Sequence, residues 1–158
     1  MSVHRIFNFS AGPAVLPLPV LEEAQRDLVA LPGVGMSVME ISHRSPTFEA
    51  ILADAVAGMR ALGGIPDHYK ILFLQGGAST QFAMVPMNLM AAGGTADYIL
   101  TGDWGKKAVK ESKKFGAAKV AGTTESGRFA RVPTQAELTL TPGASYVHMT
   151  SNETIQGV

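Results

Sequence analysis

The sequence predicts an α/β fold with a mainly parallel sheet, because apolar runs alternate with segments of helical periodicity from residue 70 onward. The first run, residues 70–75, has no polar alternation after Lys70, which is typical of a strand buried on both faces. Turns that carry glycine, serine or threonine follow the apolar runs. Because ligands of parallel sheets bind beyond the carboxyl ends of the strands, the fold class also predicts where a binding site lies.

Residues 1–18 are predicted to form an extended N-terminal arm, and residues 19–158 the domain that follows it. Prolines in and beside the arm fix the backbone and remove hydrogen-bond donors, so no regular element is expected there. Apolar residues at helical spacing then predict a helix over residues 19–31. After a loop, a second helix is predicted to start at Pro46 with Ser45 as its N-cap.

The rest of the domain alternates between strands and helices. Strands are predicted at residues 70–75, 97–101, 118–122 and 145–150. Helices are predicted at residues 79–91, with a proline inside, and at 104–115, while residues 123–143 are mostly loop. No internal repeat or low-complexity tract interrupts this order.

Composition excludes several classes of function. Thirteen basic residues balance thirteen acidic ones among 158, so no net field attracts nucleic acid or an anionic membrane. There is no cysteine, which excludes disulfides and thiolate metal sites, and the histidines show no metal-ligand spacing. No apolar run reaches the ~20 residues that span a bilayer, and no signal peptide is recognisable. A cytoplasmic protein without a metal is expected.

The turn after the first predicted strand is a candidate phosphate site. Gly76 and Gly77 permit positive φ angles and a close backbone approach. Ala78, Ser79 and Thr80 then present N–H groups at a helix N-terminus, where the helix dipole favours an anion. The alternative is an ordinary strand-to-helix turn capped by Ser79. The sequence fingerprints of the mononucleotide P-loop and of the Rossmann site are absent.

Four further residues could carry chemistry. Trp104, the only tryptophan, follows a predicted strand and could stack on a flat ligand, or it could simply pack a helix start. Thr154 follows the last strand and could bind a ring hydroxyl, or could satisfy its own turn. His43 and Arg44 suit an anionic substrate, the alternative being a solvated pair of cations.

Taken together, six segments resemble the phosphoserine aminotransferases, in the order and at the spacing of that family. The segments are Asn8–Ala14, Met39–Ser45, Phe73–Ser79, Gln81–Leu89, Thr101–Trp104 and Ser151–Gly157. The resemblance implies the fold-type-I architecture of pyridoxal-phosphate-dependent transferases. In that architecture residues 19–158 form the N-terminal part of the large domain, and the rest of the large domain and the small C-terminal domain are absent from this chain.

The resemblance also implies roles for individual residues around pyridoxal phosphate. The turn at Gly77, Ala78 and Ser79 matches the positions that hold the cofactor phosphate. Trp104 matches the aromatic residue that stacks on the pyridine ring, and Thr154 matches the threonine that binds the phenolic oxygen. A cofactor site assembled from three separate segments is therefore expected.

The implied reaction exchanges an amino group between 3-phosphohydroxypyruvate with glutamate and O-phosphoserine with 2-oxoglutarate. It belongs to serine biosynthesis and, in some bacteria, to pyridoxine biosynthesis. His43 and Arg44 match residues that bind the substrate phosphate from the neighbouring subunit of a homodimer. A small phosphorylated amino or keto acid is the expected partner, with no nucleic acid and no membrane.

The resemblance assigns no catalytic residue in this chain. The lysine that forms the Schiff base and the aspartate at the pyridine nitrogen are expected beyond Val158, on a complementary C-terminal segment. The family's strand order, as we interpret it, leaves the four predicted strands without a continuous sheet. We therefore expect that residues 1–158 do not fold stably alone.

Three other functions remain open from the sequence. One is a related aminotransferase of the same class with a different acceptor, against which the phosphate-binding pair His43 and Arg44 argues. Another is a non-catalytic module that binds a phosphate or the cofactor. A third is a structural subunit of an assembly, which would leave all six site segments without a use.

Overall fold

The computed structural model describes residues 4–10, 12 and 14–158. Residues 1–3, 11 and 13 lie outside this description, and with them the parts of the predicted arm and of the first family segment that fall there. The described arm residues up to Pro17 form no helix or strand. The chain divides into two compact units, Met1–Phe73 and Leu74–Val158, which are described separately below.

The described residues of the first unit form two helices, α1 at Leu18–Asp27 and α2 at Pro46–Gly63. Both were predicted, although α1 ends at Asp27, four residues before the expected residue 31. The predicted cap of α2 is confirmed, since the Ser45 hydroxyl accepts a 3.2 Å hydrogen bond from the Phe48 N–H. Local sequence chemistry thus sets where α2 begins.

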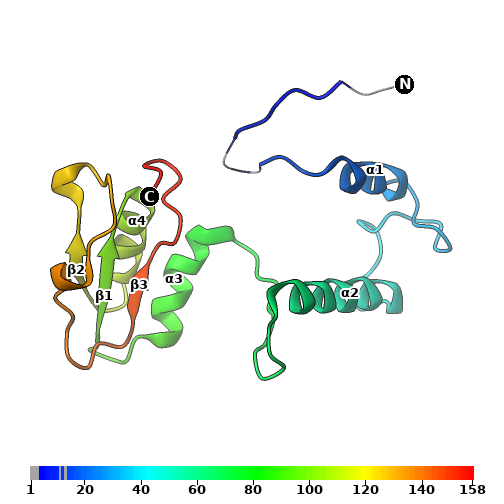
Figure 1. Cartoon of the computed structure of the whole chain (residues 1–158). Coiled ribbons are helices and arrows are strands. Elements are labelled where there is room, and N and C mark those ends of the chain that lie inside the picture. The colour runs from blue at the N-terminus through cyan, green and yellow to red at the C-terminus, as the bar shows by residue number, and fades with distance from the viewer. Residues whose placement is uncertain (1–3, 11, 13) are drawn as a thin grey trace. The chain divides into compact units, whose positions relative to one another are not determined.

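The second unit is built on a parallel three-stranded sheet in the order β2-β1-β3 (Figure 1). Its strands are β1 at Thr95–Leu100, β2 at Ala117–Thr123 and β3 at Val147–Met149. Its α-helices are α3 at Gly77–Leu89 and α4 at Asp103–Ser112, and two short 3-10 turns lie at Glu125–Gly127 and Gln135–Glu137. Helix α4 packs against β1 and β2, and α3 packs against α4.

Two expectations about strands are wrong. Residues 70–75 form no strand: they pair with no other described segment, and the Phe73 side chain is 57% exposed. The other three predicted strands do form a continuous sheet, because β3 pairs directly with β1, Tyr98 lying opposite His148. An extended apolar run becomes a strand only where a neighbour accepts its backbone hydrogen bonds, and β1 has such neighbours on both sides.

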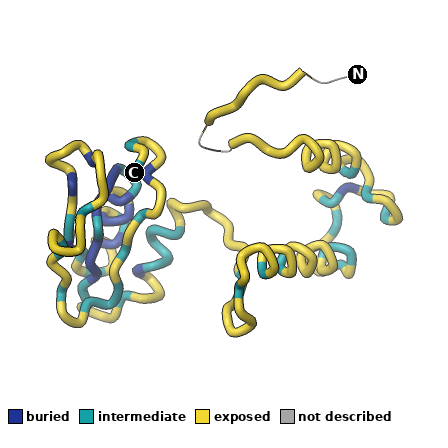
Figure 2. The backbone as a smooth tube through the Cα atoms, viewed as in Figure 1, coloured by how far each residue is buried: buried dark blue, intermediate teal, exposed yellow. Residues whose placement is uncertain are grey.

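The core of the second unit lies between β1 and α4, where Figure 2 shows the buried residues gathering. Side chains alternate between the two faces of a strand, so every second residue of β1 faces this core. There they meet apolar residues of α4 and of the loop that follows β2. The members are Ala96, Tyr98, Leu100, Ala108, Val109 and Phe129. The core is small, and the expectation that residues 1–158 do not fold stably alone stays a prediction.

Candidate functional site

The N-terminus of α3 is open to a ligand. Gly76 and Gly77 have φ angles of 91° and 59°, which only glycine adopts without strain, and a Cβ on Gly76 would overlap the Thr80 side chain. Gly76 is the N-cap, so the alternative in which Ser79 caps the helix is not what the structure has. The first helical bond runs from the Thr80 N–H to the Gly76 carbonyl, leaving three preceding N–H groups free of helical partners.

The N-terminus of α4 is closed, in contrast to that of α3. Its three N–H groups that lack helical partners all donate to side chains of the loop after β3. The Trp104 N–H donates to Glu153 Oε2 at 2.9 Å, the Gly105 N–H to Glu153 Oε1 at 2.7 Å, and the Asp103 N–H to Gln156 Oε1 at 3.4 Å. An anionic ligand therefore finds free donors at α3 and none at α4.

Trp104 is held at both ends. Besides its backbone bond to Glu153, its indole Nε1–H donates to Thr154 Oγ1 at 3.1 Å. The Lys107 ammonium group lies 4.1 Å from the indole ring centroid, a cation–π contact. Because indole nitrogen only donates, the Thr154 hydroxyl must accept this bond and keeps its own proton available for another acceptor.

A pocket of about 290 Å³ brings together three of the five predicted cofactor residues. It lies where β1 and β3 end, as expected for ligands of parallel sheets. Its lining residues come from α3, from the start of α4 and from the loop after β3: Ala78, Phe82, Trp104, Thr150, Asn152 and Thr154. Three predicted residues thus share one pocket: Ala78, Trp104 and Thr154. Gly77 and Ser79 lie on either side of Ala78 in the first turn of α3 but do not line the pocket.

Sequence reasoning assigned no role to three of the lining residues, Phe82, Thr150 and Asn152. Phe82 could have been found, because it lies four residues after Ala78 and therefore on the same face of α3. Behind Phe82, the half-buried His148 ring packs edge-on at 6.1 Å and also contacts Tyr98. Burial lowers the pKa of His148, which keeps its imidazole neutral near neutral pH.

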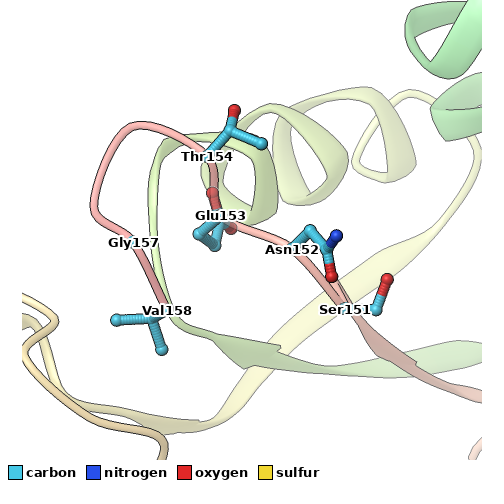
Figure 3. A pocket seen from close by; sticks show the side chains of 6 residues that line it. All are labelled: Ser151, Asn152, Glu153, Thr154, Gly157 and Val158. Atoms are coloured by element: carbon cyan, nitrogen blue, oxygen red, sulfur yellow. The ribbon is translucent and has the colours of Figure 1, made fainter. Parts of the chain in front are cut away.

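The loop after β3 also lines a second pocket, of about 310 Å³, which shares Asn152 and Thr154 with the first. Figure 3 shows the residues that line this second pocket. Residues Ser151–Thr154, Gly157 and Val158 line it. The loop folds back on itself, since the Glu153 N–H donates to the Val158 carbonyl and the Gly157 N–H to the Glu153 carbonyl, both at 2.7 Å. These bonds give the segment that carries Thr154 a defined backbone.

His43 and Arg44 belong to the first unit, where both are exposed in the turn before α2. The Ser42 hydroxyl accepts a 3.2 Å hydrogen bond from the Arg44 N–H and fixes this turn. Both side chains are thus available to an anion.

Two features are absent from the described residues. No helix among them is long and apolar enough to cross a bilayer. They also contain no group of three or more histidine and carboxylate side chains placed to hold a metal ion.

Comparisons with known proteins bear on the family and the fold of this chain. The family model of the class-V aminotransferases matches residues 6–158. The phosphoserine aminotransferase of Nitrosomonas europaea is 54% identical over 156 residues, which is 99% of this chain and 42% of the relative. Among solved structures, the phosphoserine aminotransferase of Bacillus circulans subsp. alkalophilus superimposes with a TM-score of 0.90 at 51% identity.

A second solved structure, the phosphoserine aminotransferase of Trichomonas vaginalis with pyridoxal phosphate bound, matches at a TM-score of 0.89 and 38% identity. It aligns with 98% of this chain and 44% of its own, and the Bacillus structure with 95% and 42%. The chain therefore spans less than half the length of the relatives that it matches. The likeness confirms the predicted α/β fold class as that of the N-terminal part of these structures.

Proposed function

Because the chain belongs to the class-V aminotransferase family, we propose that it forms part of a pyridoxal-phosphate-dependent phosphoserine aminotransferase. The proposed reaction exchanges an amino group between O-phosphoserine with 2-oxoglutarate and 3-phosphohydroxypyruvate with glutamate, in serine biosynthesis and, in some bacteria, pyridoxine biosynthesis. One observation carries the proposal: a single pocket joins Ala78, Trp104 and Thr154. When bound, the cofactor supplies an electron sink for the carbon that loses or gains the amino group.

The residues present suit such a cofactor. A phosphate accepts hydrogen bonds from the free N–H groups at Gly77, Ala78 and Ser79, and the α3 dipole adds to the attraction. The indole of Trp104 would offer a stacking surface to a flat pyridine ring. The Thr154 hydroxyl, already accepting from the indole, would donate a hydrogen bond to a phenolic oxygen.

The other parts of the proposal come from the family resemblance. None of the seven lysines lines the pocket, and we propose that the reacting amine comes from a complementary segment outside these residues, with 19–158 as the first part of the large domain. His43 and Arg44 bind the substrate phosphate across a homodimer interface. The enzyme acts in the cytoplasm on small substrates.

Reconstitution with a relative tests the function. We expect glutamate to form from O-phosphoserine and 2-oxoglutarate when this chain is mixed with pyridoxal phosphate and the C-terminal part of the Nitrosomonas enzyme. After borohydride reduction of this mixture, the cofactor should be attached to the C-terminal part, and the mass of this chain should be unchanged. Pyridoxal, which lacks the phosphate, is the matched control and should bind more weakly.

Other outcomes of this assay support other functions. Activity with alanine or aspartate but not with O-phosphoserine indicates a class-V aminotransferase with a different acceptor. Cofactor binding without activity in any reconstituted mixture indicates a non-catalytic binding module. No cofactor binding at all contradicts the proposal.

The substrate role of Arg44 has its own test. Replacing Arg44 by alanine should raise the KM for O-phosphoserine roughly 10–100-fold, because a bidentate phosphate contact contributes about 1.5–3 kcal/mol. Absorbance of the bound cofactor should not change, since Arg44 does not line the cofactor pocket. Arg26→Ala is the control, because this exposed arginine pairs with Asp27 on α1. An unchanged KM would remove Arg44 from the substrate site.

A further inference from the structure

We propose that Glu153 is a positioning residue: its buried carboxylate caps α4 and so orients Trp104 and Thr154 toward the cofactor ring. The inference rests on the proposed function and concerns a residue that does not line the cofactor pocket. Glu153 therefore acts through its neighbours rather than by touching the cofactor.

Burial of the carboxylate is the first observation. Glu153 is 1% exposed, and a buried carboxylate is stable only where hydrogen bonds replace its hydration. Both of its oxygens accept backbone N–H groups, from Trp104 at 2.9 Å and from Gly105 at 2.7 Å. These donors sit at a helix N-terminus, whose dipole favours a negative charge. The carboxylate thus has one well-defined position, and it defines the position of the Trp104 backbone.

The second observation is that consecutive residues hold opposite ends of Trp104. Glu153 accepts from its backbone N–H, and Thr154 accepts from its indole Nε1–H at 3.1 Å. Two fixed points restrict both the start of α4 and the rotation of the indole ring. Because Thr154 follows Glu153 directly, the same carboxylate bonds also anchor the hydroxyl that lines the pocket.

Two glycines make room for this arrangement. A Cβ on Gly102 would lie 2.5 Å from the Glu153 carboxylate carbon, and a Cβ on Gly105 would lie 3.2 Å from Glu153 Oε1. The backbone of the α4 N-terminus therefore approaches the carboxylate more closely than side chains would allow. Because backbone packs against both carboxylate oxygens, the carboxylate has little freedom to move. Such a fixed carboxylate can hold the α4 N-terminus in one position.

The test compares Glu153→Gln with Glu137→Gln. The amide of glutamine keeps one acceptor oxygen, loses the charge and turns an N–H₂ group toward a backbone donor. Glu137 is the matched control, because it also accepts an N–H at the start of a helical turn, that of Thr134, but it is exposed and lines no part of the cofactor pocket. Fluorescence of Trp104, taken as the difference from Trp104→Phe, reports the indole environment in the cofactor-free complex of this chain with the complementary C-terminal part.

We expect Glu153→Gln to shift Trp104 emission to longer wavelength and to increase its quenching by acrylamide, with far-UV circular dichroism preserved. The Kd for pyridoxal phosphate should rise roughly tenfold, the amount that one charge-assisted hydrogen bond contributes. Glu137→Gln should change neither signal. If Glu153→Gln does not fold, Glu153→Asp takes its place, because it keeps the charge but draws the carboxylate back from the two donors.

The outcomes separate this inference from the proposed function. Unchanged Trp104 emission and unchanged Kd in the folded variant, even with a lower melting temperature, would make Glu153 purely structural and overturn the inference. If the unsubstituted protein binds no pyridoxal phosphate, the proposed function fails, and the cofactor-free emission of Trp104 still decides whether Glu153 orients it.

Discussion

Replacing Gly102 by alanine is expected to lower the free energy of unfolding by about 3 kcal/mol and to weaken cofactor binding at the same time. Gly102 lies between β1 and α4, and its φ of 171° is extended backbone that alanine also adopts. The cost is therefore steric. The added methyl group would lie 2.5 Å from the Glu153 carboxylate and 2.6 Å from Gln156 Oε1.

A clash with the end of a flexible side chain is usually relieved by rotating that side chain. Here relief is costly, because Glu153 is buried and both of its oxygens already accept backbone N–H groups. Moving the carboxylate breaks at least one of these bonds and leaves a buried donor without a partner. If the Glu153 carboxylate instead stays in place, the start of α4 must move away from the loop after β3, and Trp104 moves with it.

Urea unfolding without pyridoxal phosphate measures the loss in free energy of unfolding. The further stabilisation when pyridoxal phosphate is added measures the change in cofactor binding. Gly127→Ala is the control in the same unit, because a Cβ there meets nothing within 4 Å and the φ of Gly127 is not positive. We expect that variant to stay within about 0.5 kcal/mol of the unsubstituted protein. Equal stability of Gly102→Ala and Gly127→Ala would mean that the Glu153 carboxylate moves freely, contrary to its described position.

Features set by local chemistry could be read from the sequence. Ser45 and Pro46 mark the start of α2 because a hydroxyl acceptor and a fixed φ both favour that position, and the structure has the predicted hydrogen bond. The strand β2 lies within one residue of its prediction at each end. The interaction that decides the start of α2 lies within three residues, whereas β2 also needs its pairing with β1.

Which strands pair with one another could not be predicted from the local sequence. Residues 70–75 have the composition of a buried strand, yet no described segment pairs with them, whereas the three-residue strand β3 pairs with β1. Apolar composition reports that a segment suits a sheet, but pairing depends on which backbone lies alongside. The local sequence does not show this pairing, because Tyr98 and its partner His148 are fifty residues apart.

Some residues of the candidate site could be predicted from the sequence, and others could not. Ala78, Trp104 and Thr154 could be named from their segments, and the structure places all three in one pocket. Glu153 could not be given a role of its own from the sequence, because its contact with the α4 N-terminus spans 49 residues for Trp104. A residue that acts by positioning others carries no local pattern of its own.

The largest loss of cofactor affinity is expected from Trp104→Ala. Removing the indole takes away the stacking surface of the pocket and the donor to Thr154, so the Kd for pyridoxal phosphate should rise roughly 100-fold. Trp104→Phe keeps an aromatic face but has no Nε1–H, so a rise of only about fivefold is expected, from the loss of one hydrogen bond. The difference between the two variants separates stacking from hydrogen bonding.

Because both variants remove the fluorophore, the Kd must come from equilibrium dialysis with cofactor absorbance as the readout. Phe115→Ala is the control: it also truncates an aromatic residue beside α4, but Phe115 is partly exposed and does not line the pocket. Equal affinities of Trp104→Ala and Trp104→Phe would mean that no ring stacks on the indole. The α3 N-terminus alone would then hold the cofactor through its phosphate, and the Glu153 carboxylate would have no ring to orient.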